Sequence, residues 1–118
     1  MTNQEWTPAF YLEDNGSSPV EDFLADLDRQ TRSRIYTAME RLRQVNLRAR
    51  EPLVRHLERD LWELRQGSDG NIYRFIYFFF SGRRIVYVHA FQKKTQKTPQ
   101  HEIELGQKRL KELLDEKS

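Results

Sequence analysis

Apolar residues recur at helical spacing through the first half of the chain. One set follows the spacing i, i+3, i+4, i+7 and consists of Val20, Phe23, Leu24 and Leu27. A second set repeats this spacing and consists of Ile35, Ala38, Met39, Leu42 and Val45. Such spacing places each set on one face of a helix. The pattern therefore predicts two amphipathic helices, or one helix broken near residues 28–31.

The start of the first helix is marked by its capping residues. Ser18-Pro19-Val20-Glu21 has the form of a capping box with proline at the first helical position. The side chains of such a box satisfy the first unpaired backbone N–H groups. Before it, residues 5–12 predict a short strand that ends at a turn formed by residues 14–16.

The second half of the chain has a different pattern. After Pro52, which discourages further helix, short runs rich in branched and aromatic residues cover residues 53–57, 61–66, 72–80 and 84–91. Turn-forming residues at 67–71 and 81–82 predict antiparallel hairpins between them. Thr98-Pro99 then opens a C-terminal helix with an apolar stripe of Ile103, Gly106, Leu110, Leu113 and Leu114.

The predicted order is strand, two helices, three or four strands and a final helix. This order indicates an α+β fold in which an antiparallel sheet packs against an N-terminal helix pair, with a C-terminal helix. A chain of 118 residues with 37% hydrophobic content builds one core, so we expect a single domain over residues 1–118. Residues 73–80 are aromatic on both faces, as expected for a central strand covered on both sides.

Charge changes this picture because it is unevenly distributed. Residues 1–28 carry seven acidic residues and no Lys or Arg, whereas residues 29–97 carry 16 basic residues against 6 acidic ones. The middle of the chain is therefore expected to face a polyanion, unless the charges only form a solvated surface. The chain has no cysteine and no apolar run of the length that a membrane helix needs. We expect a cytoplasmic protein without disulfides and without a membrane partner.

Strand parity brings opposite charges together. Because side chains alternate along a strand, Trp62 and Leu64 share one face while Glu63 and Arg65 share the other, about 7 Å apart. Arg74 on the neighbouring strand lies within cross-strand reach of that face. A surface ion pair would explain Glu63 and Arg65 equally well. If the groups converge, a base and several cations would meet, as phosphodiester cleavage requires.

A basic segment follows the last predicted strand. Residues 89–99 contain Lys93, Lys94 and Lys97 and no acidic residue. A solvated loop would also explain these lysines. In RNA the neighbouring 2′-hydroxyl can attack the phosphate, so cleavage would require neither a metal nor a cofactor. The histidines His56, His89 and His101 are too scattered to predict a metal site, although His56 and His89 lie on predicted strands near the basic segment.

Three motifs together resemble a known family. They are LWELR at residues 61–65, YRFIY at residues 73–77 and HAFQKKTQKTP at residues 89–99. In this order they look like the HigB branch of the RelE/ParE toxin superfamily, including its phage-derived members, over about residues 5–114. The resemblance implies the RelE-like fold. It also implies a type II toxin-antitoxin system, ribosome-dependent mRNA cleavage, and inhibition by a cognate antitoxin that is a helix-turn-helix protein.

The resemblance also assigns residues by position. It implies a catalytic set of Glu63, Arg65, Arg74 and Lys94, in which Glu63 is either the base or an orienting partner for Arg65. It implies RNA binding by Arg55, His56, Arg59, His89, Lys93 and Lys97. Relatives often carry lysines in the region where this chain has Arg55, His56 and Arg59. The alternative function is non-enzymatic: a ParE-type gyrase inhibitor, or an inactive relative that only binds its antitoxin.

Overall fold

A five-stranded sheet forms the centre of the molecule. The computed structural model describes residues 5–93 and 96–117. The strands lie in the order β1-β5-β4-β3-β2, and three α-helices and one short 3₁₀ helix accompany them. The elements are β1 (Thr7–Phe10), α1 (Pro19–Ala25), α2 (Arg29–Val45), η1 (Asn46–Arg48), β2 (Val54–Glu58), β3 (Leu61–Ser68), β4 (Asn71–Phe80), β5 (Arg84–Lys93) and α3 (Gln100–Lys117).

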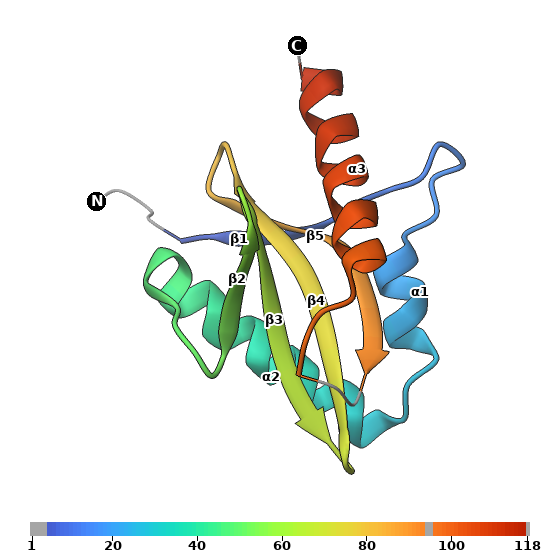
Figure 1. The fold of residues 1–118 in the computed structure, drawn as a ribbon, viewed down its shortest axis with the longest axis vertical. Helices are drawn as coiled ribbons and strands as arrows, with labels where there is room; N and C mark the ends of the chain where they lie inside the picture. Colours follow the sequence, from blue (N-terminus) through green and yellow to red (C-terminus); the bar gives the residue numbers. More distant parts are fainter. Residues whose placement is uncertain (1–4, 94–95, 118) are drawn as a thin grey trace.

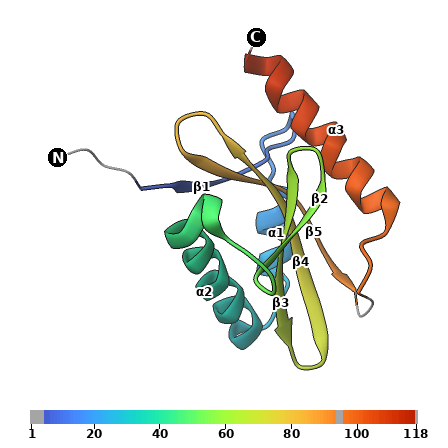
Figure 2. The ribbon, with the colours of Figure 1, turned by 60° about the vertical axis from the view of Figure 1, so that its left-hand side comes forward.

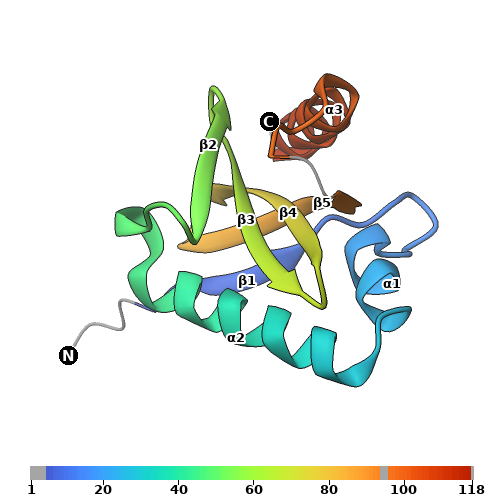
Figure 3. The same cartoon turned by 60° about the horizontal axis from the view of Figure 1, so that its bottom comes forward.

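The helices lie on opposite faces of the sheet. Helices α1 and α2 cover one face and α3 lies on the other, as Figures 1 and 3 show. Figure 2 shows the same three layers from the side, with the sheet between α2 and α3. This arrangement confirms the α+β, RelE-like fold expected from the sequence. No helix among the described residues is long and apolar enough to cross a membrane.

The two N-terminal helices begin at side-chain caps. The hydroxyl of Ser18 accepts a hydrogen bond from the backbone N–H of Glu21 at 3.2 Å, as the capping box predicts. Helix α1 ends at Ala25, and Asp28 caps α2 by accepting from the N–H of Thr31 at 2.7 Å. Of the two alternatives left by the sequence, the structure therefore has two separate helices.

The strands from β2 to β5 form an antiparallel meander, as predicted. Strand β1 differs because it adds to the sheet in parallel, with Thr7 opposite Arg84 and Phe10 opposite Tyr87. A sheet that was expected to be antiparallel is therefore mixed at this edge. Alternation along a strand shows which faces are buried but not which neighbour pairs with it, so the parallel pairing could not be predicted.

Two apolar cores confirm the predicted strand parity. One core joins α1 and α2 to the sheet face that carries Leu64. The other joins α3 to the face that carries Leu61 and Ile76. A Cβ atom added at Gly106 would lie 3.1 Å from Cγ2 of Ile76, so glycine lets α3 approach the sheet closely. Leu114, expected in the apolar stripe of this helix, is instead 44% exposed.

Candidate functional site

A buried carboxylate lies at the centre of a polar cluster on the α3 side of the sheet. Glu63 is 0% exposed. Its Oε2 accepts a hydrogen bond from the Thr98 hydroxyl at 2.7 Å, and its Oε1 lies 2.9 Å from Nε of Arg65. Nη1 of Arg74 lies 3.4 Å from the same Oε1. The side chains predicted to converge therefore do so, but around a carboxylate that solvent does not reach.

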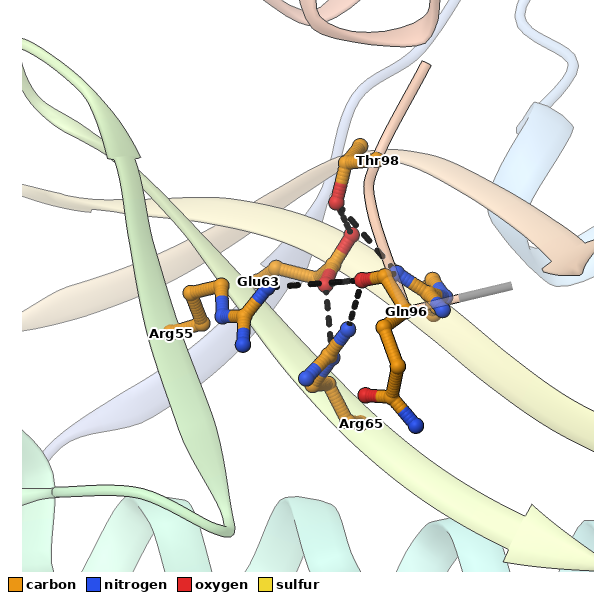
Figure 4. Close-up of polar contacts among 6 residues, drawn as sticks. Arg55, Glu63, Arg65, Gln96 and Thr98 are labelled. Atoms are coloured by element: carbon orange, nitrogen blue, oxygen red, sulfur yellow. Dashed lines mark hydrogen bonds and ion pairs between the residues drawn. The ribbon is translucent and has the colours of Figure 1, made fainter. Parts of the chain in front are cut away.

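Three guanidinium groups also converge on one oxygen atom. The backbone carbonyl of Gln96 accepts hydrogen bonds from Nη1 of Arg74 at 3.0 Å, from Nη1 of Arg55 at 3.3 Å and from Nη2 of Arg65. Figure 4 shows this carbonyl beside the carboxylate of Glu63, with Arg55 and Arg65 directed toward it from two strands. An oxygen that receives three cationic donors occupies a position suited to negative charge.

The register of the sheet builds this cluster. Glu63 lies opposite Arg55 on β2, and Arg65 lies directly opposite Arg74 on β4. Two like charges directly opposite one another destabilise a sheet unless a counter-charge lies between them. The carboxylate of Glu63 supplies that charge, since it is within ion-pair distance of both Arg65 and Arg74. Glu63 and Arg65 thus form a buried network instead of a surface pair.

The segment of residues 96–99 covers the cluster, and the sequence did not identify its role. Thr98 was expected to open the C-terminal helix, but α3 begins at Gln100 and the Thr98 hydroxyl binds Glu63. Gln96 takes part through its backbone, which any residue type provides. Only the position of Thr98 in the polar segment after β5 could have indicated such a contact.

Electrostatics at the cluster are dominated by cations. Burial lowers the pKa of Arg74, and the nearby Arg65 and Arg55 lower it further, whereas Glu63 acts in the opposite direction. An arginine nevertheless stays charged near neutral pH. Among the described residues, Nε and Nη2 of Arg74 have no hydrogen-bond partner, although the side chain is 0% exposed. The cluster therefore retains unused donor capacity next to an excess of positive charge.

Other predicted residues lie around this cluster or apart from it. The ring of His56 packs against that of Trp62, with centroids 4.8 Å apart, on the face of the sheet opposite to Glu63. Arg59 lies in the turn between β2 and β3, where its carbonyl contacts Nε2 of His56 at 2.7 Å. The structure does not bring these two residues to the cluster. Lys93 ends β5, Lys97 is exposed beside Gln96, and Lys94 lies outside the described residues.

His89 lies on the same face of the sheet as Glu63, with Ile76 between them in the cross-strand register. Its Nε2–H donates to Oε1 of Glu102 on α3 at 2.6 Å. Burial lowers the pKa of His89 below its ordinary value of 6.5, although the Glu102 carboxylate acts in the opposite direction. His89 is thus held by α3 and is separate from the arginines.

The lowered pKa of His89 leads to a pH-dependence prediction. The unfolded chain takes up a proton at this position before the folded protein does, so the free energy of unfolding should fall as the pH drops below 6.5 and through the folded pKa. Urea unfolding at about pH 7.5 and about pH 5.5 should show this loss for the native protein and a smaller one for His89→Gln. The control is His56→Gln, because His56 is exposed and packs against Trp62, away from His89 and Glu102. An unchanged pH dependence in His89→Gln would contradict the assignment.

The described residues contain no group of three or more His, Cys, Asp or Glu side chains that could hold a metal ion.

A family model described as "Phage derived protein Gp49-like (DUF891)" matches residues 22–111. No curated protein matches the chain. The match runs from within α1 to within α3 and includes every described residue of the cluster. It agrees with the phage-derived, toxin-like character of the sequence resemblance without distinguishing the HigB branch. The chain therefore belongs to the family of phage-derived Gp49-like proteins.

Proposed function

We propose that this protein is the toxin of a type II toxin-antitoxin system, of the HigB kind, and cleaves mRNA on the ribosome. One observation carries the proposal: three arginine side chains converge on a single oxygen atom beside a buried carboxylate. In the cleavage reaction, a phosphate oxygen of the RNA takes the place of the Gln96 carbonyl oxygen. Its partner in the system is a helix-turn-helix antitoxin.

The arrangement suits stabilisation of a charged transition state. Attack by a 2′-hydroxyl on the adjacent phosphate forms a 2′,3′-cyclic phosphate and breaks the bond to the 5′-oxygen of the next nucleotide, while water takes up the hydroxyl proton and supplies a proton to the leaving oxygen. Negative charge grows on the phosphate oxygens in this step, and fixed cations lower its barrier. Arg65 and Arg55 are the more accessible of the three arginines, whereas Arg74 is fully buried. Neither a metal nor a cofactor is part of this proposal.

Glu63 acts in this proposal as a positioning residue. Both carboxylate oxygens are already engaged, one by Thr98 and the other by Arg65 and Arg74. A carboxylate whose two oxygens are both engaged holds the guanidinium groups around it in a fixed orientation. Such preorganisation is a large part of electrostatic catalysis. Of the two roles left open by the sequence, the contacts therefore support the orienting one.

Expression of the chain alone tests the function. We expect growth to arrest through loss of translation, with new 5′ ends in translated mRNA detected by primer extension. Naked RNA should be cut poorly by the purified protein, because the ribosome orients the substrate.

Three results would contradict the proposal in different ways. Intact mRNA with trapped gyrase–DNA complexes would favour the ParE-type alternative. Normal growth with tight antitoxin binding would favour an inactive relative. Rapid, metal-dependent digestion of naked RNA would indicate a different nuclease mechanism.

A further inference from the structure

A hollow of about 660 Å³ lies beside the arginine cluster. It is formed where α2 ends, where the chain passes through η1 and residues 49–53, and along the part of β3 that β2 does not cover. Strand β2 starts at Val54, which pairs with Leu64, and one more backbone hydrogen bond joins the N–H of Arg65 to the carbonyl of Leu53, so this edge of β3 has no strand partner from Gln66 onward. The register of β2 and β3 thus creates this hollow.

The lining of the hollow is strongly cationic. Four arginines line it: Arg41, Arg48, Arg50 and Arg65. The only acidic residue among its lining residues is Glu51. Within the described part of the chain, none of the first three arginines has an ion pair, in contrast to Arg34 and Arg43. A lining of this kind complements an anionic ligand.

The lining also has an apolar component. It includes Val45, Ala49, Leu53 and Ile72. A site for phosphate alone does not need apolar residues. A nucleotide combines a flat apolar ring with an anionic phosphate, and guanidinium groups both stack on bases and bind phosphates. The volume lies in the range of small-molecule sites, roughly 300–1,000 Å³.

Arg65 connects the hollow with the cluster. Arg65 lines the hollow, and its side chain contacts both Glu63 and the Gln96 carbonyl. An RNA strand can place its scissile phosphate at the three converging arginines. The nucleotide next to that phosphate then lies at the opening of the hollow. Unpaired RNA can turn a base out of its stack into such a site.

We propose that this hollow is a subsite for one nucleotide of single-stranded RNA next to the scissile phosphate. The base lies against the apolar residues, and phosphates on the side away from the scissile phosphate bind Arg41, Arg48 and Arg50. The inference rests on the proposed function, because it takes RNA as the substrate. It adds a recognition site on α2 and the η1 region, beside the residues assigned to the chemistry and sharing only Arg65 with them.

Binding of a short fluorescent 2′-O-methyl oligonucleotide tests the subsite. This probe has no free 2′-hydroxyl, so it is not cleaved by 2′-hydroxyl attack, and fluorescence anisotropy reports binding alone. At about 50 mM salt, Arg48→Gln and Arg50→Gln should each weaken binding by about tenfold. Each should also reduce the salt dependence by about 0.7 in the slope of log K against log salt, as expected for one phosphate contact with a single strand.

A matched control separates the hollow from general positive charge. Arg83 is exposed in the turn between β4 and β5, at the opposite end of β4 from Ile72. Arg83→Gln removes the same charge and should change binding by less than about twofold. Equal effects of Arg48→Gln, Arg50→Gln and Arg83→Gln would overturn the inference.

A second variant tests the base. Gly67 lines the hollow, and a Cβ atom there would lie 3.7 Å from its nearest contact, the Asn71 carbonyl oxygen, which is an ordinary distance. Gly67→Leu should weaken binding of the normal probe but not of a probe that lacks its bases. Equal binding of both probes by the native protein, or equally tight binding of a polyglutamate peptide, would overturn the assignment to a nucleotide.

The two proposals can fail separately. If the probe binds as described but mRNA stays intact on the ribosome, the subsite stands and the nuclease function fails. If mRNA is cleaved and Arg48→Gln and Arg50→Gln match the native protein in probe binding, the nuclease function stands and the subsite fails.

Discussion

Replacing Glu63 by Ala is expected to lower the free energy of unfolding by about 3–5 kcal/mol. Arg74 is 0% exposed, and among the described residues Glu63 is its ion-pair partner. Without the carboxylate, a buried cation remains uncompensated opposite a second cation, Arg65. The Thr98 hydroxyl also loses its acceptor. Urea unfolding at neutral pH measures the loss.

Matched variants identify the cause of this loss. Glu63→Gln keeps the size of the side chain and removes the charge, so it should be nearly as unstable as Glu63→Ala. Glu104→Ala is the control, because Glu104 is exposed on α3. The double variant Glu63→Leu with Arg74→Leu replaces the pair by apolar groups and should recover much of the stability, as in other buried ion pairs. Equal stability of Glu63→Ala and Glu104→Ala would show that the cluster does not hold the sheet together.

Replacing Arg65 by Ala is expected to reduce the rate of mRNA cleavage on the ribosome by about a hundredfold, or about 3 kcal/mol of transition-state stabilisation. The side chain is 13% exposed and reaches the oxygen on which the arginines converge. Stability should fall less than in Glu63→Ala, because Glu63 still has Arg74 and Thr98. Cleavage of ribosome-bound mRNA and thermal unfolding are measured in parallel.

Two further variants make this result specific. Arg65→Lys keeps the charge but not the planar fork of donors, so it should restore only part of the activity. Arg83→Ala removes an exposed arginine at a distant turn and should be fully active. A fully active Arg65→Ala protein would reject the role of this residue. An Arg65→Ala protein that is inactive only because it is unfolded would also reject this role.

The local features of the fold were predictable because they depend on short-range chemistry. Capping by Ser18, the periodicity of the helices and the turns between strands all act within a few residues. Parity along β3 also predicted that Glu63 and Arg65 share a face. These features need no knowledge of what lies across the sheet.

The candidate site was predictable only in part. The sequence indicated Glu63, Arg65 and Arg74, and it proposed Arg55 as an RNA contact instead of a member of their cluster. It gave no sign that Glu63 would be fully buried, because burial depends on what covers a face. The covering group is the backbone of Gln96 and the hydroxyl of Thr98, which lie 33 and 35 residues from Glu63 in the sequence. Such contacts have no periodic pattern in the sequence.

The sequence by itself determined the helices, the strands, the uneven charge and the face of β3 that carries the acid and the arginine. Each of these follows from side-chain alternation, helical spacing or capping. Only the tertiary structure decided that β1 lies parallel to β5, that three arginines meet at one carbonyl oxygen, and that a cationic hollow opens beside them. The physical reason is that strand partners and covering segments are selected by packing and charge compensation between distant parts of the chain.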